Sequence, residues 1–171
     1  MGLFKSILGN KKAADLPQIT TENHTVYAPF DGQVITLEEI NDGVFSSGVL
    51  GSGIGMIPDE ETVYAPFDGK IIQVADTKHA IGILSKDNIE LLIHIGMDTV
   101  SMKGKGFEVF VSEGDTVTCG QKLMTFSKKA ISQAGFPDTA AIVITNSDDF
   151  QNITPLTAGK VSHQTKIMEA K

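Results

Sequence analysis

Two histidines, His79 and His94, stand fifteen residues apart in apolar segments of strand-like character. The first lies in TKHAIGI, residues 77–83, and the second in LLIHIGMD, residues 91–98. The turn-type cluster SKDN, residues 85–88, separates the two segments and predicts a β-hairpin. With a turn of two or four residues, His79 pairs directly with His94, and their Cβ atoms lie about 4.5–5.5 Å apart. Two facing imidazoles at a strand end could transfer a phosphoryl group or bind a metal ion.

Each histidine also has an ordinary interpretation. A single histidine in a strand is most often a satisfied core or edge residue, and this interpretation is the better one for either residue alone. Two histidines in cross-strand register favour a reactive pair. The register decides between the two interpretations, because a slip of one residue would place the rings on opposite faces of the sheet.

Phosphoryl transfer requires a neutral imidazole with one nitrogen free and the other held as a hydrogen-bond donor. A backbone oxygen near Gly96 could hold that nitrogen, and the opposing histidine could donate to the phosphoryl oxygens. Thr77 lies two residues before His79, so its hydroxyl could orient either ring. Asp98 could act as an acceptor near His94, or it could be an ordinary turn residue at the strand end.

Zinc-dependent hydrolysis is a second interpretation of the pair. It requires three protein ligands and an open coordination position, and the sequence contains no HExxH motif. The other histidines, His24 and His163, lie in polar segments, and we expect them at the surface. A zinc ion held by His79 and His94 together with a carboxylate of a partner protein is the metal alternative that stays open.

The composition predicts one acidic globular domain. The chain has 171 residues, 41% of them hydrophobic, a formal net charge of −7 and a pI near 5.0, which argues against nucleic acid as a partner. Its one cysteine, Cys119, lies in a turn-like TCG segment and suits a reducing compartment. The chain has no apolar run of membrane-spanning length and no evident signal peptide, so we expect a cytoplasmic protein.

An internal repeat predicts the fold. VYAPFDGQVI at residues 26–35 and VYAPFDGKII at residues 63–72 are identical at eight of ten positions, and PLTAGKV at residues 155–161 is a looser copy. Each copy has the signature of a β-hairpin or corner. Short period-two segments follow at residues 107–111 and 122–126, then a buried segment at 140–145 and a terminal strand from 160 to 167. We therefore predict an all-β, antiparallel sandwich of about a dozen strands, with helical turns only near 128–135 and 148–152.

The N-terminal 18 residues differ from the rest and are expected to form a flexible tail, followed by one domain over residues 19–171. Leu3, Phe4, Ile7 and Leu8 fall on one face of a helix, with lysines elsewhere. This pattern fits a weak amphipathic contact with an anionic membrane surface. A disordered leader with the same pattern by chance is an equal alternative.

The histidine segments carry a resemblance to a known family. TKHAIGI, LLIHIGMDTVSMKGKGF (residues 91–107) and the APFDG repeats strongly resemble the glucose-type IIA component of the bacterial phosphoenolpyruvate-dependent sugar phosphotransferase system. The resemblance runs from about Val26 to Ile167, and the opening MGLF is similar to the tail of free-standing members. It implies a β sandwich of the duplicated hybrid type and a phosphotransferase that carries phosphohistidine and requires no cofactor.

The resemblance also implies roles for the site residues. His79 would accept the phosphoryl group from the phosphocarrier protein HPr and pass it to a cysteine on the IIB domain of a sugar permease, for uptake of glucose-type sugars. His94 would be the assisting histidine, with Thr77 as its hydrogen-bond partner, and the Gly96 carbonyl would hold His79. The alternatives are a regulatory binding module controlled by phosphorylation and a zinc-dependent hydrolase of related fold.

Family members present apolar residues around the active-site depression. By position, the candidates for this docking face are Val44, Phe45, Ile54, Ile81 and Val100, with Gly96 and Asp98 beside them. For Ile54, an ordinary core residue is an alternative interpretation to a docking residue. Phe45 is flanked by Gly43 and Ser46, so we expect it to be exposed in a loop.

Overall fold

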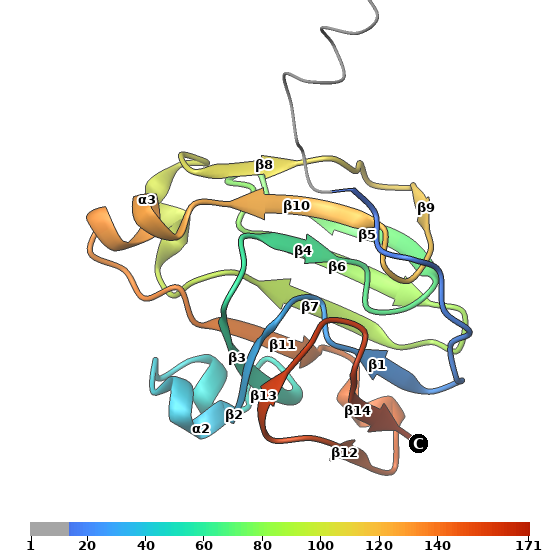
Figure 1. The fold of residues 1–171 in the computed structure, drawn as a ribbon. Helices are drawn as coiled ribbons and strands as arrows, with labels where there is room; N and C mark the ends of the chain where they lie inside the picture. Colours follow the sequence, from blue (N-terminus) through green and yellow to red (C-terminus); the bar gives the residue numbers. More distant parts are fainter. Residues whose placement is uncertain (1–13) are drawn as a thin grey trace, which may run out of the picture.

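Strands form most of the regular structure of the computed structural model, which describes residues 14–171 (Figure 1). The strands are β1 (Thr25–Tyr27), β2 (Gly32–Thr36), β3 (Ser52–Pro58), β4 (Thr62–Tyr64), β5 (Gly69–Val74), β6 (Ala80–Ser85), β7 (Glu90–His94), β8 (Phe107–Val109), β9 (Thr116–Val117), β10 (Lys122–Phe126), β11 (Ala140–Ile144), β12 (Ile153–Pro155), β13 (Gly159–Val161) and β14 (Lys166–Ala170). The helical segments are α2 (Leu37–Ile40), η1 (Phe45–Ser47), η2 (Thr99–Met102), α3 (Lys128–Gln133) and η3 (Ser147–Asp149). The predicted all-β class is confirmed.

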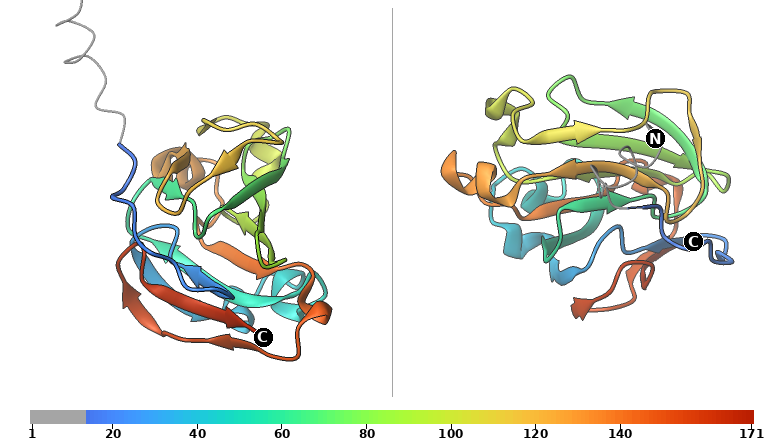
Figure 2. Two further views of the ribbon diagram at one scale, coloured as in Figure 1. Left: turned by 90° about the vertical axis from the view of Figure 1, so that its right-hand side faces the viewer. Right: turned by 45° about the horizontal axis from the view of Figure 1, so that its top comes forward.

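Three antiparallel sheets build the domain. One sheet has eight strands in the order β13-β2-β3-β11-β7-β6-β5-β9, and two have three strands, β1-β14-β12 and β4-β10-β8. Every strand pair is antiparallel. Both views of Figure 2 show the blue β1 against the red β14. Residues at the two ends of the domain therefore lie side by side.

The sheet orders contain a duplication. Strands β1, β2 and β3 correspond to β4, β5 and β6, and strands β11 to β14 correspond to β7 to β10. With this correspondence, the order of strands in the eight-stranded sheet is the same from either end. The two small sheets correspond in the same way. One half thus consists of β4 to β10 and is inserted in the chain between the two parts of the other half. The centre of the large sheet, between β11 and β7, is where the halves meet.

The APFDG repeats of the two halves also bind each other, through strands β1 and β4 of the small sheets. The N–H of Tyr27 donates to the carbonyl of Pro66 at 2.9 Å, and the N–H of Tyr64 donates to the carbonyl of Pro29 at 2.8 Å. The two contacts are equivalent, since residues 27 and 64 have the same place in the repeat. The repeat seen in the sequence therefore forms the junction of the two halves.

A second repeated segment appears only in the structure. Residues 117–124 (VTCGQKLM) and 161–168 (VSHQTKIM) have equivalent places, although few of their residues are identical. The N–H of Gly120 donates to Ala65, and the N–H of Gln164 donates to Ala28, both at 2.9 Å. The predicted terminal strand over 160–167 is consequently split by a turn into β13 and β14.

Buried apolar side chains fill the space between the sheets. The largest fully buried ones include Phe30, Met56, Ile83, Ile93 and Leu123. On β11 the side chains alternate: Ala140, Ile142 and Ile144 join this main core, while Ala141 and Val143 join a second, smaller cluster with Leu37, Phe45 and Met97. β11 is therefore buried on both faces, and α2 and η1 cover the second face near the end of β7.

The helical segments agree in part with expectation. α3 and η3 lie where helical turns were predicted, but α2, η1 and η2 were not expected. α2 is a single turn with a capping box, in which the Thr36 side chain accepts from the Glu39 N–H and the Glu39 side chain accepts from the Thr36 N–H. The T-x-x-E signal for this turn is present in the sequence.

Part of the predicted flexible tail lies against the domain. The N–H of Leu16 donates to Gly120 at 2.8 Å, Asp15 accepts from the Lys122 N–H at 2.8 Å, and the Pro17 carbonyl accepts from the Gln164 side chain at 2.9 Å. Residues 15–17, which the prediction placed in the tail, therefore contact the domain. The predicted amphipathic face of Leu3 to Leu8 lies outside the described residues and stays a prediction.

Candidate active site

The hairpin that carries both histidines has a three-residue turn, residues 86–88. The N–H of Ser85 donates to the carbonyl of Ile89 at 2.9 Å, and Asn88 has a left-handed conformation with φ of 70°. A left-handed third residue is a common way to close such a turn. Ala80, and not His79, therefore pairs with His94. The predicted direct pairing of the histidines is wrong by one residue, because it assumed a turn of two or four residues.

The two rings still meet, because His79 lies in a turn before β6 begins. The N–H of Lys78 donates to the carbonyl of Ala75 at 2.8 Å, and Lys78 has φ of 62°, so the chain changes direction just before His79. His79 is thereby freed from the strict alternation of the strand. Its carbonyl still accepts from the N–H of Ile95 at 2.8 Å. The ring centroids of His79 and His94 lie 4.6 Å apart with an interplanar angle of 86°.

His94 has a defined tautomer. It is the last residue of β7, a central strand, and its Nδ1 lies 2.9 Å from the carbonyl oxygen of Gly96. A carbonyl oxygen can only accept, so Nδ1 carries the proton and Nε2 has the free lone pair. Gly96 is required at this turn: it has φ of 76°, and a Cβ there would lie 2.3 Å from Cγ2 of Thr99.

His79 has a different partner. Its Nδ1 lies 2.7 Å from Oγ1 of Thr77, which is in the same turn. A hydroxyl can donate or accept, so this contact alone leaves both tautomers open. The predicted partners are therefore wrong: the Gly96 carbonyl holds His94 instead of His79, and Thr77 contacts His79 instead of His94. Each nitrogen binds a group two residues away in its own segment, since that group is the one within reach.

Burial keeps both imidazoles neutral at physiological pH. The pKa of His94 falls to about 4, mainly because of burial and further because of the neighbouring His79, while the Gly96 carbonyl and Asp42 act in the opposite direction. Burial also lowers the pKa of His79 below its usual 6.5. A neutral imidazole has the lone pair that a nucleophile needs.

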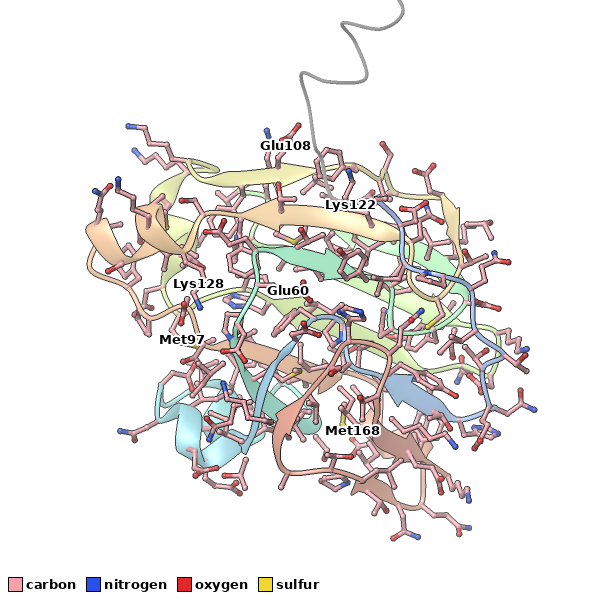
Figure 3. All side chains as sticks on the ribbon, viewed as in Figure 1. Glu60, Met97, Glu108, Lys122, Lys128 and Met168 are labelled. Atoms are coloured by element: carbon pink, nitrogen blue, oxygen red, sulfur yellow. The ribbon has the colours of Figure 1, made fainter. Side chains whose placement is uncertain are left out.

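His94 lines a shallow depression of about 150 Å³ next to α2 and η1. Its lining residues are Asp42, Val44, Phe45, His94, Met97, Asp98 and Val100. Met97 appears just above α2 in Figure 3. The ring of Phe45 contacts that of His94, with centroids 4.8 Å apart. Side chains from two loops, residues 41–48 and 96–100, thus surround one face of His94.

The depression includes only part of the expected docking face. Val44 and Val100 are 48% and 53% exposed, and Asp98 is exposed beside them. Ile81 is fully buried in the main core and Phe45 is only 6% exposed, so both are wrong as exposed docking residues. β6 is buried on both faces at Ile81, and Phe45 turns inward onto His94. Ile54 belongs to the main core, in agreement with its alternative interpretation.

The remaining titratable candidates lie elsewhere. Cys119 is buried, and burial first and Asp68 second raise the pKa of its thiol to about 12, so the thiol stays protonated at physiological pH. His163 is half-buried rather than fully at the surface, with Nδ1 at 2.8 Å from Asp31 and 3.4 Å from Glu60. These three residues are the group within 14–171 whose spacing could admit a metal ion. The backbone N–H of His163 donates to Asp31 at 2.7 Å, and the ring nitrogen Nδ1 hydrogen-bonds with Glu60 at 3.4 Å. His79 and His94 would need a third ligand from another molecule.

Two site residues escaped the sequence analysis. Asp42 and Met97 line the depression, but neither stands in a pattern with the histidines. The DGxxSS segment at residues 42–47 is an Asp-Gly turn signal, which marks a loop without showing that it lies over His94.

Comparison with known proteins identifies the family. Residues 24–150 match the family described as the phosphoenolpyruvate-dependent sugar phosphotransferase system, EIIA 1. The chain therefore belongs to this family, whose members are phosphotransferases that carry phosphoryl groups between proteins. The resemblance expected from the histidine segments is confirmed. Within residues 14–171, no helix is long and apolar enough to cross a membrane.

Named relatives are of two kinds. The chain is 41% identical over 150 residues to the glucose-specific EIIA component of Bacillus cereus, covering 87% of this chain and 91% of that protein. It is 40% identical over 158 residues to a β-glucoside-specific EIIBCA component of Dickeya chrysanthemi, but spans only 25% of that longer protein. Among solved structures it resembles glucose permease IIA from Mycoplasma capricolum, with a TM-score of 0.79, 34% identity, and coverage of 89% of this chain and 98% of that one. The predicted β-sandwich is confirmed.

Proposed function

We propose that His94, and not His79, accepts the phosphoryl group. The observation that supports this assignment is the 2.9 Å contact between Nδ1 of His94 and the Gly96 carbonyl, which leaves Nε2 as the nucleophile. His94 lines the surface depression, whereas only 7% of His79 is exposed. The assignment expected from the resemblance is reversed here, because the nitrogen held by a carbonyl belongs to the other ring.

The proposed transfer has two steps, and in each step one bond to phosphorus forms while another breaks. In the first, the lone pair of His94 Nε2 attacks the phosphorus of phosphorylated HPr, and the bond from phosphorus to its carrier atom on HPr breaks. In the second, a cysteine thiolate on the IIB domain of a sugar permease attacks the same phosphorus, and the electron pair of the P–N bond returns to Nε2. Both steps, as proposed, balance with protein groups alone.

His79 assists in both steps. If the Thr77 hydroxyl donates to Nδ1 of His79, then Nε2 of His79 carries a proton and can donate to a phosphoryl oxygen. A donor placed in advance stabilises the charge that develops in the transition state. The 4.6 Å separation of the rings puts such a donor beside the nucleophile.

The partner face is proposed to centre on Val44 and Val100, with Asp98 at its rim. Their exposure on either side of His94 is consistent with an apolar centre and an acidic edge that attracts basic partners. Val100→Asp is expected to raise the KM for HPr, whereas Ile19→Asp, at an exposed residue in the segment before β1, leaves it unchanged. Equal effects of the two substitutions would misplace the face.

The family's longer relatives support a proposal for the cellular setting. The Dickeya protein is named as one EIIBCA component, which supports a permease as the partner of this chain. We propose a cytoplasmic location and service to a glucose-type sugar. Regulation of other proteins through the same face, and a zinc ion shared with a partner's carboxylate, are secondary proposals; the two histidines supply only two of the ligands that such an ion requires.

The direct test is phosphorylation from phosphoenolpyruvate with enzyme I and HPr, followed by identification of the modified residue. Modification of His94 at Nε2 is the expected result. Modification of His79 would restore the assignment made from the resemblance, and no modification would contradict the phosphocarrier function of this chain.

A further inference from the structure

The loop between α2 and β3 forms one wall of the depression and has little regular structure of its own. Asn41 and Gly43 have left-handed conformations, with φ of 53° and 79°, and Gly48 has φ of 75°. Between them η1 provides a single 3-10 turn, residues 45–47, without a side-chain hydrogen bond from its N-cap, Val44. Something other than regular secondary structure must therefore hold this loop in place.

The carboxylate of Asp42 supplies that support. Its Oδ1 accepts from the N–H of Ser46 at 3.0 Å and of Val44 at 3.3 Å, and its Oδ2 accepts from the N–H of Phe45 at 3.1 Å. The Gly43 N–H donates to the Ser46 hydroxyl at 3.0 Å, which closes the same turn. Burial alone would raise the pKa of Asp42, but these backbone hydrogen bonds outweigh it and hold the pKa below its usual value.

The residues bound by Asp42 are those that reach the reactive ring and the rim. Phe45 packs inward, with its ring 4.8 Å from that of His94, and joins the small core of Leu37 and Met97. Val44 points outward and is 48% exposed. The geometry of one turn thus sets both the packing against His94 and the apolar surface beside it.

Asp98 provides a natural comparison on the opposite wall. It lines the same depression and has a left-handed conformation with φ of 61°. It stands at the N-cap of η2, yet its side chain makes no capping hydrogen bond. Asp98→Asn should therefore remove one negative charge from the depression and leave the hydrogen bonds of Asp42 in the 42–48 loop unchanged.

We infer that Asp42 is a positioning residue for phosphoryl transfer: its carboxylate holds the 42–48 loop so that Phe45 packs against the ring of His94. The inference rests on the proposed role of His94. His94 is a nucleophile whose Nε2 must stay aligned with phosphorus, and misplacement by about 1 Å can reduce a transfer rate by about 10². Asp42 acts through Phe45 and does not touch the phosphoryl group.

The test compares Asp42→Ala, Asp42→Asn and Asp98→Asn by NMR and by rate. Phe45 shifts the ring protons of His94 through its ring current, so these resonances report the Phe45–His94 contact. Asp42→Ala is expected to lose that shift and to lower kcat for transfer from HPr about tenfold or more. Asp42→Asn keeps one acceptor oxygen and should fall between Ala and the wild type. Asp98→Asn should leave the ring-current shift unchanged.

Three outcomes would overturn the inference. One is an Asp42→Ala protein that keeps both the ring-current shift and the wild-type kcat. Another is an equal change in ring-current shift with Asp98→Asn, which would assign the effect to charge. The third is an Asp42→Asn protein as impaired as Asp42→Ala although its ring-current shift is retained. Labelling of His79 in the wild type would instead contradict the proposed function, while the NMR comparison would still decide whether Asp42 holds the loop.

Discussion

The two halves of the domain share one arrangement of strands but differ in the residues at two corresponding positions. His94 is the last residue of β7, and its counterpart in the other half is Ile144, the last residue of β11. His79 directly precedes β6, and its counterpart, Gly51, directly precedes β3. A Cβ at Gly51 would lie 2.2 Å from the carbonyl oxygen of Ile144, so the counterpart positions are neighbours in both halves.

The comparison separates the contribution of the backbone arrangement to the site from the contribution of the side chains. Both halves bring a residue from before one strand next to the end of an adjacent central strand. Only the β4–β10 half carries imidazoles there, together with Thr77 and the Gly96 carbonyl as hydrogen-bond partners. The other half fills the position with an isoleucine in the main core. We therefore propose that phosphoryl transfer depends on four residues that the duplicated arrangement of strands brings together: Thr77, His79, His94 and Gly96.

The largest expected effect comes from removing the nucleophile from the half that carries it. His94→Gln should abolish labelling by phosphorylated HPr, because glutamine has no nucleophilic nitrogen, while His79→Gln should still be labelled. Radiolabel transfer with a circular dichroism spectrum for each variant checks this. A labelled His94→Gln protein beside an unlabelled His79→Gln protein would reverse the roles.

The next effect concerns the assisting ring. His79→Gln should slow onward transfer to the IIB domain by about 10²–10³, the usual loss when one preorganised donor is removed. Single-turnover transfer from the isolated phosphorylated protein measures this step alone. Transfer at the wild-type rate would show that His79 only packs against His94.

A smaller effect should follow from the hydroxyl that orients His79. Thr77→Val removes one hydrogen bond at nearly constant volume. That bond is worth about 0.5–1.5 kcal/mol, which predicts a loss of about twofold to thirteenfold in transfer rate. Thr77→Ser, which keeps the hydroxyl, serves as the control. If Thr77→Val and Thr77→Ser have the same rate, the contact of 2.7 Å does not orient the ring.

The last prediction concerns stability instead of transfer rate, and its effect is absent at physiological pH. The pKa of His94 is about 4 in the folded state against 6.5 unfolded, so the unfolded state binds more protons between these values. This contribution to stability is complete above pH 6.5 and is lost as the pH falls toward 4, at no more than about 1.4 kcal/mol per pH unit. Urea unfolding should show a shallower pH dependence for His94→Gln than for the wild type. Parallel curves would mean that His94 titrates normally in the folded protein.

Much of this protein was predictable from its sequence. Period-two segments, Asp-Gly turns and an internal repeat predicted an antiparallel β sandwich, because strand alternation and turn chemistry are local properties. The two histidine segments were specific enough to indicate the family. The segment 161–168 was harder to recognise as a copy of 117–124, because its backbone geometry is kept while most of its side chains differ.

Only the tertiary structure decided how the two histidine rings are oriented. The turn of residues 86–88 sets the register, and whether it has two, three or four residues depends on the left-handed conformation of Asn88. Phe45 lies in a polar loop and yet packs inward, because Ala141 and Val143 on the distant β11 offer it an apolar surface. The proposed choice of His94 over His79 rests on which ring nitrogen meets a carbonyl oxygen, and that contact forms only when Gly96 turns the chain back toward the end of β7. The sequence alone determines residue types and their local pattern. The orientation of a ring relative to a backbone oxygen is determined only when the chain folds.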